Sequence, residues 1–337
     1  MKRHATLLLC LLAAACASTP GGDGARPDWI DGQSSEYPQA LFLSGQGSAL
    51  TPQDAKDRAR SELAKQFEVA VRERSQQAQT FSSQQTGDES VQSLEQRVSR
   101  QLLTSTAKSL QGVQIAEQWH DQSSGQYHAL AVLSRSRARL QFEQEIAALD
   151  DRSRQWLRRA ENEDMLLKRA GCVQQAIAAQ QQRSVVQSSL QVVDASGRGQ
   201  PSVISLAELE RSRDTLLSRI TLQPSASGAM ASELSNLLSA ATASAGFKVT
   251  DSTRGDYRLL AQALLDPVIE QDGWYWIRGT LQLKLVNDAG NDIGVKRWEL
   301  KASSTNVERA RQRFLSDTDA LLKDELRQVL LGFAVKP

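Results

Sequence analysis

Histidine, the residue type used most often for acid–base and metal chemistry, is nearly absent from this 337-residue chain. Apart from His4, it occurs only as His120 and His128, which flank the predicted turn 121–125. Together with Asp121, these side chains would form a metal site if the two imidazoles approached each other across the turn. Three ligands on one turn make a poor catalytic site. We therefore interpret them as surface polar residues and expect no metal.

Two glycines, Gly45 and Gly47, follow a predicted strand and precede a predicted helix, which is the position of a phosphate-binding loop. The third glycine of that motif is missing, because Leu50 stands where it would be. No acidic residue follows a second strand at the usual distance. We interpret Gly45-Gln46-Gly47 as a tight turn with positive φ, and expect no nucleotide or other cofactor.

The remaining candidates for catalysis also have structural explanations. No serine lies in a nucleophile-elbow pattern. The neighbouring carboxylates Asp150 and Asp151 lie on a predicted helix beside Arg152 and Arg154, which is typical of solvated ion pairs. We therefore expect no catalytic residue, and the chain is predicted not to be an enzyme.

Cys16 stands at the end of an amino-terminal targeting sequence. Lys2 and Arg3 precede an apolar run over 5–12, and small residues lead into the cysteine. This order indicates a signal peptide over 1–15, and the run is too short to span a bilayer. A cysteine directly after the cut resembles a bacterial lipobox, which implies that Cys16 is the lipid-attachment residue and carries acyl chains such as palmitate. The alternative is an ordinary secretory signal cut near Ala15, which leaves Cys16 as a free thiol.

The lipobox resemblance also implies a location. Several acyl chains give stable membrane attachment, and Ala17 stands where inner-membrane lipoproteins of that class carry Asp. We expect attachment to the periplasmic face of the outer membrane. Residues 16–26, rich in Gly and Pro, are predicted to form a lipidated, flexible linker.

Composition excludes two other classes. The chain has 40 Lys and Arg against 39 Asp and Glu, and this balance argues against nucleic-acid binding. Cys10 leaves with the signal and Cys16 is modified, so Cys172 has no partner for an intramolecular disulfide. Its place in a predicted helix indicates a small packed residue.

Hydrophobic periodicity predicts an α+β fold: two small antiparallel-sheet and helix domains, 27–134 and 220–337, joined by a long α-helical hairpin region over 135–219. The first domain has a strand at 41–44, a helix from Pro52 capped by Thr51, a polar stretch over 75–87 read as an exposed strand or a loop, a second helix over 91–107 and a hairpin over 113–133. The last has a short strand at 220–222 that ends in a turn at Pro224, a helix over 230–241, an antiparallel meander and a closing helix over 307–333.

Two groups of tryptophans have candidate roles. Trp274 and Trp276 share one face of a predicted strand, where aromatic residues serve either as core or as anchors for a partner. We single them out as a candidate partner surface. Trp29, just after the linker, is interpreted as attaching the linker to the first domain.

The residues Pro27-Asp28-Trp29-Ile30, the stretch 42–47 and the Ala-rich helix over 55–71 resemble the Lpp-twenty family of bacterial surface lipoproteins and the amino-terminal part of some flagellar assembly proteins. The resemblance covers about a third of the chain and implies a non-enzymatic domain. The last domain is similar in element order to accessory lipoproteins with an anticodon-binding-like fold, found beside secretion and polysaccharide-export pores.

These observations favour a non-catalytic, outer-membrane lipoprotein that acts as a scaffold or assembly factor in the cell envelope, in a flagellar or secretion-type structure. We expect an envelope protein as its partner, no nucleic acid, and leave a homo-oligomer open. Two alternatives remain at this point: an activator of a periplasmic cell-wall enzyme, and a lipoprotein that binds an apolar ligand between the helical hairpin and a sheet.

Overall fold

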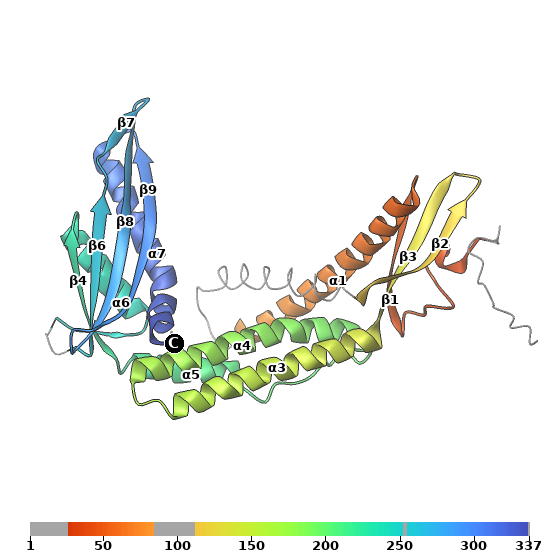
Figure 1. Ribbon diagram of the computed structural model, residues 1–337, viewed down its shortest axis with the longest axis horizontal. Coiled ribbons are helices and arrows are strands. Elements are labelled where there is room, and N and C mark those ends of the chain that lie inside the picture. The colour runs from red at the N-terminus through yellow and green to blue at the C-terminus, as the bar shows by residue number, and fades with distance from the viewer. Residues whose placement is uncertain (1–25, 84–111, 252–254, 336–337) are drawn as a thin grey trace, which may run out of the picture. The chain divides into compact units, whose positions relative to one another are not determined.

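The computed structural model describes residues 26–83, 112–251 and 255–335, so the signal peptide, Cys16 and the linker up to residue 25 lie outside it. The chain divides into two compact units (Figure 1): unit 1 is Met1–Arg139 with Val192–Gly197, and unit 2 is Leu140–Gln191 with Arg198–Pro337. Helices and largely antiparallel sheets make up the described parts, which confirms the predicted α+β class. None of the helices in these parts is long and apolar enough to cross a membrane.

Unit 1 contains a three-stranded antiparallel sheet in the order β1-β3-β2. Its elements are a 3-10 helix η1 (Asp28–Asp31), β1 (Phe42–Ala49), α1 (Pro52–Ser83), β2 (Gln114–Asp121) and β3 (Gln126–Ser134). The Oγ1 of Thr51 accepts a hydrogen bond from the Asp54 backbone N–H at 3.2 Å, so the predicted cap is confirmed. The prediction of an exposed strand or a loop after Ser75 is wrong as far as Ser83, because α1 continues to that residue. The second helix predicted over 91–107 lies outside the described residues.

Gly45 and Gly47 lie inside β1 and not in a turn, which corrects the predicted tight turn. Their role is close packing: a Cβ on Gly45 would lie 2.5 Å from the backbone N of Leu63, and one on Gly47 would collide with the backbone of Ala59 and Ala55. The glycines therefore let α1 approach β1 at backbone distance. The expected apolar stripe of α1 is buried there, namely Ala55, Ala59, Leu63, Phe67 and Val71.

The helical region consists of α3 (Arg135–Glu161), α4 (Leu166–Val193) and the shorter α5 (Leu206–Leu217). The chain breaks between α3 and α4 at Asn162 and Glu163, and Gly171 lies inside α4. Gly171 has a packing role, because a Cβ there would lie 3.0 Å from the carbonyl oxygen of Leu331. Ser205 caps α5 by accepting a hydrogen bond from the Glu208 N–H at 3.3 Å.

Unit 2 also contains a six-stranded sheet in the order β5-β4-β6-β8-β7, with β9 paired to β8. Its elements are β4 (Thr221–Gly228), α6 (Ala231–Ser244), β5 (Lys248–Val249), β6 (Tyr257–Leu265), β7 (Ile269–Gln271), β8 (Trp274–Asn287), β9 (Asp292–Ser304) and α7 (Val307–Val335). The meander of β6, β8 and β9 is antiparallel as predicted.

One edge of this sheet differs from the antiparallel arrangement that the sequence predicts. β4 runs parallel to both β5 and β6, so β4, α6 and β5 form a parallel crossover unit. β4 continues to Gly228 through Pro224, where the sequence predicts a turn. The short strand β7 was also not predicted.

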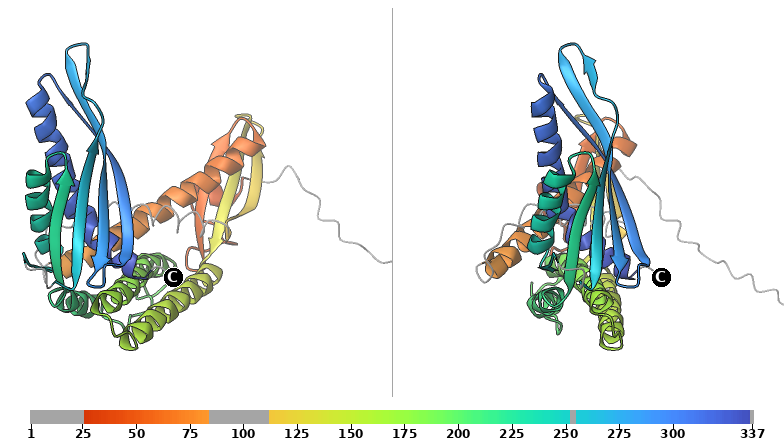
Figure 2. Two further views of the ribbon diagram at one scale, coloured as in Figure 1. Left: turned by 60° about the vertical axis from the view of Figure 1, so that its left-hand side comes forward. Right: turned by 90° about the vertical axis from the view of Figure 1, so that its left-hand side faces the viewer.

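The helices α6 and α7 cover the same face of the six-stranded sheet, as Figure 2 shows. β8 contributes Leu281, Leu283 and Leu285 to this side, and each is fully buried. They join one core with residues of α6 and α7, among them Leu238, Leu322, Leu326 and Leu330. Within the described residues of unit 2, no helix covers the opposite face, which we call the open face.

Candidate functional site

The residues of β8 alternate between the core and the open face. Ile277 is buried with Phe314 of α7 in a small core cluster, so the neighbours Trp276 and Arg278 point to the other side. Trp274 lies on the same side and is 43% exposed, while Trp276 is half-buried. The structure therefore places both predicted tryptophans on the open face.

Strand register brings further side chains to these tryptophans. Ile269 of β7 is the partner of Trp276, and Leu264 of β6 is the partner of Thr280 on the same face. Ile269 is 46% exposed and Leu264 is 49% exposed, although apolar residues of this size usually gain by burial. β9 pairs with the other edge of β8, and its Lys301 lies opposite Arg278 on the same open face.

We call this group the β7–β8 patch: Leu264, Ile269, Trp274, Trp276, Arg278 and Lys301. Its aromatic and basic parts are in contact, because the Lys301 Nζ lies 4.3 Å from the centroid of the Trp276 ring. This is a cation–π geometry. Tryptophan and arginine, both present in the patch, are enriched among the residues that dominate binding at protein interfaces.

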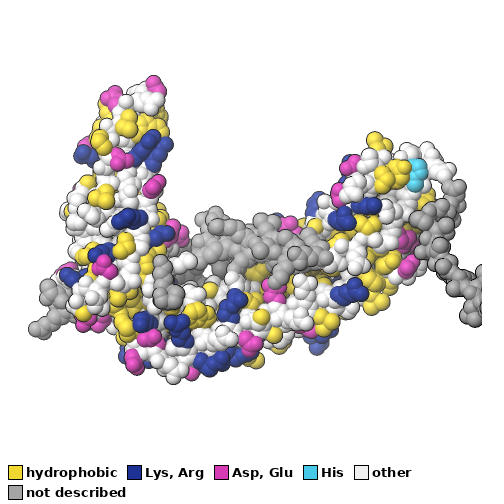
Figure 3. All heavy atoms as spheres, viewed as in Figure 1, with side chains coloured by type: hydrophobic (Ala, Val, Ile, Leu, Met, Phe, Trp, Pro, Cys, Tyr) yellow, Lys and Arg dark blue, Asp and Glu magenta, His cyan; other side chains and the backbone are white. Residues whose placement is uncertain are grey.

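Basic side chains extend along the open face below the patch, as Figure 3 shows for the part of the chain that contains β8 and β9. Lys284 is neutralised by Asp292 at 2.8 Å, and the Arg297 Nε donates to Gln282 Oε1 at 2.8 Å. The acidic residues around the patch are Glu299, opposite Thr280, and Asp266, whose backbone N–H donates to the Arg278 carbonyl. Glu270 and Asp272 also lie beside it, between Ile269 and Trp274 in the chain.

Trp29 is 1% exposed and packs on the face of the unit 1 sheet that carries Leu130 and Val132. The Trp29 Nε1 donates to Glu117 Oε2 at 2.7 Å, and Gln46 Nε2 donates to the Trp29 carbonyl. The chain that follows the linker is thus attached to the first sheet by a buried side chain, as its position in the sequence indicates.

The two histidines do not face each other, which corrects the geometry considered from the sequence. Register pairs His120 with Tyr127, and the two rings stack with centroids 4.2 Å apart. Trp119, which precedes His120 in β2, is paired with His128. Because adjacent residues of a strand point to opposite faces, the two imidazoles lie on opposite faces of the hairpin. Hydrogen bonds from Ser123 and Ser124 lower the pKa of the Asp121 carboxyl. Among the described residues, no group of three side chains is arranged to hold a metal.

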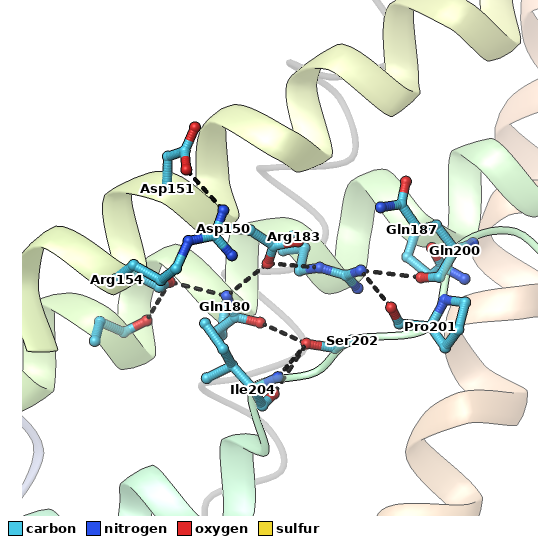
Figure 4. A network of polar contacts seen from close by, with 12 residues as sticks. Asp150, Asp151, Arg154, Gln180, Arg183, Gln187, Gln200, Pro201, Ser202 and Ile204 are labelled. Atoms are coloured by element: carbon cyan, nitrogen blue, oxygen red, sulfur yellow. Dashed lines mark hydrogen bonds and ion pairs between the residues drawn. The ribbon is translucent and has the colours of Figure 1, made fainter.

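A buried polar network in the helical region was missed by the sequence reasoning (Figure 4). Asp150, interpreted as a solvated residue, is 6% exposed, and its Oδ1 lies 2.9 Å from the Nε of Arg183. The interpretation holds for Asp151, which pairs with Arg154 at the surface. A polar residue at a helical core position was the available signal, since Asp150 follows Ile146 and Leu149 on the apolar stripe.

This network joins three segments of unit 2. Gln180 Nε2 donates to Asp150 Oδ1 at 3.0 Å, and Gln180 Oε1 accepts from Ser202 at 3.1 Å. Arg183 Nη2 donates to the carbonyls of Gln200 and Pro201. Because these groups are occupied by one another and buried, the network fixes the 200–202 loop on the hairpin and is structural.

Two further features bear on chemistry. Cys172 is 1% exposed, and burial raises the pKa of its thiol, which disfavours the reactive thiolate. A hollow of about 190 Å³ lies between the start of α4 and the sheet, lined among others by Leu167, Tyr257 and Phe333. It is smaller than the roughly 300–1,000 Å³ of sites for small molecules, so it gives little support to the apolar-ligand alternative.

Comparison with known proteins finds a family match for the first part of the chain. Residues 27–134 match the LPP20 lipoprotein family, and the resemblance expected from Trp29 and the following strand and helix is confirmed. No curated protein matches the chain.

Solved structures also resemble the chain. A secreted protein of the human pathogen Helicobacter pylori matches with a TM-score of 0.42 and 12% identity, covering 84% of this chain and 96% of its own. A minor lipoprotein of Acinetobacter baumannii matches with a TM-score of 0.25 and 14% identity, covering 34% of this chain and 90% of its own.

Proposed function

We propose that the protein is a non-catalytic lipoprotein, anchored through Cys16 to the periplasmic face of the outer membrane, that holds a protein partner of an envelope assembly on the β7–β8 patch. The observation that carries this proposal is the patch itself. Exposed Ile269 and Trp274 are neighbours at one end of the open face, and exposed Leu264 lies further along the same face, opposite Thr280. Exposed apolar side chains gathered on one face mark interaction sites.

The anchor gives this surface its place in the cell. Signal and lipobox together favour acylation of Cys16, and the LPP20 match of residues 27–134 supports a lipoprotein. Trp29 then joins the lipidated linker to a folded domain through a buried contact. In this scheme the protein acts by position: the lipid fixes the chain to the bilayer, and the patch captures a partner.

The anchor is tested by intact-mass analysis of native material and by fractionation of cells. We expect the mass of a chain that begins at an acylated Cys16, found in the outer membrane. A Cys16→Ser variant should leave the membrane fraction, because acyl chains are the source of stable attachment. An unmodified amino terminus in the soluble fraction of wild-type cells would overturn the anchor.

Partner binding is tested by chemical crosslinking in intact cells followed by purification of the full chain. The proposal expects recovery of one or a few envelope proteins. Recovery of no envelope protein would contradict it. Turnover of cell-wall fragments by the pure protein would contradict its non-catalytic part, and stimulation of a wall synthase without such turnover would favour the activator alternative.

A further inference from the structure

We infer that the partner presents an acidic, amphipathic protein segment to the β7–β8 patch, with apolar side chains against Ile269 and Trp274 and carboxylates at Arg278 and Lys301. This inference rests on the proposed function and adds the chemistry of the partner. The apolar part follows from the exposed side chains, which need a nonpolar cover. The acidic part follows from the charges beside them.

Arg278 and Lys301 are directly opposite each other across the β8–β9 ladder. Like charges in this position destabilise a sheet, whereas opposite charges stabilise it. None of the ion pairs found among the described residues includes Arg278 or Lys301. The Lys301 ammonium is instead held over the Trp276 ring. An anion placed between the two cations would relieve their repulsion, so the pair favours a negatively charged ligand.

Arg258 and Arg297 add two cations to the open face, on β6 and β9. Carboxylates also surround the patch: Glu299 and Asp266, and Glu270 and Asp272 at the end of the sheet. The site for an anion is therefore local to Arg278 and Lys301, which face each other. A partner with excess negative charge would gain both in rate of encounter and in orientation.

A bilayer surface is the other anionic partner that matches tryptophan beside lysine. Acidic residues at the end of the sheet disfavour it. Glu270 lies between Ile269 and the turn, and Asp272 forms that turn with Gly273. Inserting Ile269 and Trp274 into a membrane interface would carry both carboxylates toward anionic headgroups and the apolar layer, which is unfavourable. A protein segment can leave these carboxylates in water.

The test is site-specific photo-crosslinking with the full chain in intact cells. A benzoylphenylalanine at Ser303, which is opposite Trp276, reports what covers the patch. Mass spectrometry of the digested adduct should identify a protein segment with excess Asp and Glu interleaved with apolar residues. An adduct to lipid, or to a segment without excess negative charge, overturns the inference. Absence of any protein adduct overturns the proposed function as well.

A charge reversal makes the test quantitative. Arg278→Glu places opposite charges across the ladder, so the variant should fold at least as well as wild type. We expect it to lower the adduct yield about tenfold. Arg309→Glu, an equal charge reversal at an exposed position near the start of α7 on the other side of the sheet, is the matched control and should retain the yield. Equal yields for Arg278→Glu and wild type would contradict the role of the cations.

Discussion

Lys301 holds its ammonium 4.3 Å from the centre of the Trp276 ring, while Trp274, two residues earlier on the same strand, is 43% exposed. The two tryptophans therefore have different roles. Trp276 and Lys301 support each other within the sheet, and Trp274 with Ile269 remains open to a partner. This division separates the effects of substitutions on folding from their effects on binding.

We expect Trp276→Ala to lower the free energy of unfolding by about 1–2 kcal/mol, through lost burial and the lost cation–π contact. Trp274→Ala should change it by less than about 0.5 kcal/mol, because exposed substitutions rarely cost more. Urea denaturation followed by circular dichroism measures both values. Equal losses would contradict the division of roles.

Asp150 and Arg183 form a buried ion pair whose side chains are 9% and 4% exposed. Asp150→Asn leaves the Arg183 guanidinium buried without a counter-charge, so we expect a loss of about 3–5 kcal/mol in unfolding free energy. The neighbouring variant Asp151→Asn removes an exposed pair with Arg154 and should cost less than about 1 kcal/mol. Urea titration of both variants tests the difference. Similar costs would show that burial does not determine how much the Asp150–Arg183 pair contributes to the unfolding free energy.

Gly47→Ala should destabilise unit 1 by about 1–3 kcal/mol, because the added methyl group meets the backbone of α1. Gly332→Ala in α7 is the counterpart, since a Cβ there meets no atom within 4 Å. It should stabilise the helix by up to about 1 kcal/mol. Thermal unfolding should show a lower Tm for Gly47→Ala and a higher Tm for Gly332→Ala. A Gly47→Ala protein as stable as wild type would refute the close packing of α1 on β1.

Trp29→Ala should cost about 3–5 kcal/mol, as expected for removal of a buried aromatic side chain. Trp29→Phe keeps a ring in place but leaves the Glu117 carboxylate without the indole N–H, so we expect a smaller loss of about 1–2 kcal/mol. Limited proteolysis should then cut near Trp29 earlier in the Ala variant than in the Phe variant. Wild-type protection of both variants would contradict the attachment of the linker to the sheet.

Where periodicity decides, the sequence predicted this fold well. The stripe of α1, the antiparallel strands β6, β8 and β9, and the common face of Trp274 and Trp276 all follow from spacing along one segment. The spacing of residues within one segment does not show which other segment packs against it. The contact of Lys301 with Trp276, and the pairing of β7 with β8, depend on register between strands and appeared only in the structure.

The errors have the same origin. Gly45 and Gly47 resemble a turn until the backbone of α1 is seen against them. Asp150 resembles a surface carboxylate until Arg183, from another helix, is placed beside it. The sequence predicts a turn at Pro224, yet this residue lies in β4, where a proline is tolerated only if its missing N–H is not needed for the ladder. In each case a long-range contact overrides the local pattern.

In the proposed function, the β7–β8 patch captures a protein partner at the cell envelope. Its most direct test is crosslinking in intact cells with wild-type and Trp274→Ala chains, with the amount of recovered envelope protein measured at equal expression. We expect Trp274→Ala to lower the recovery about tenfold or more, with folding and membrane attachment unchanged. Equal recovery by the two chains would contradict it.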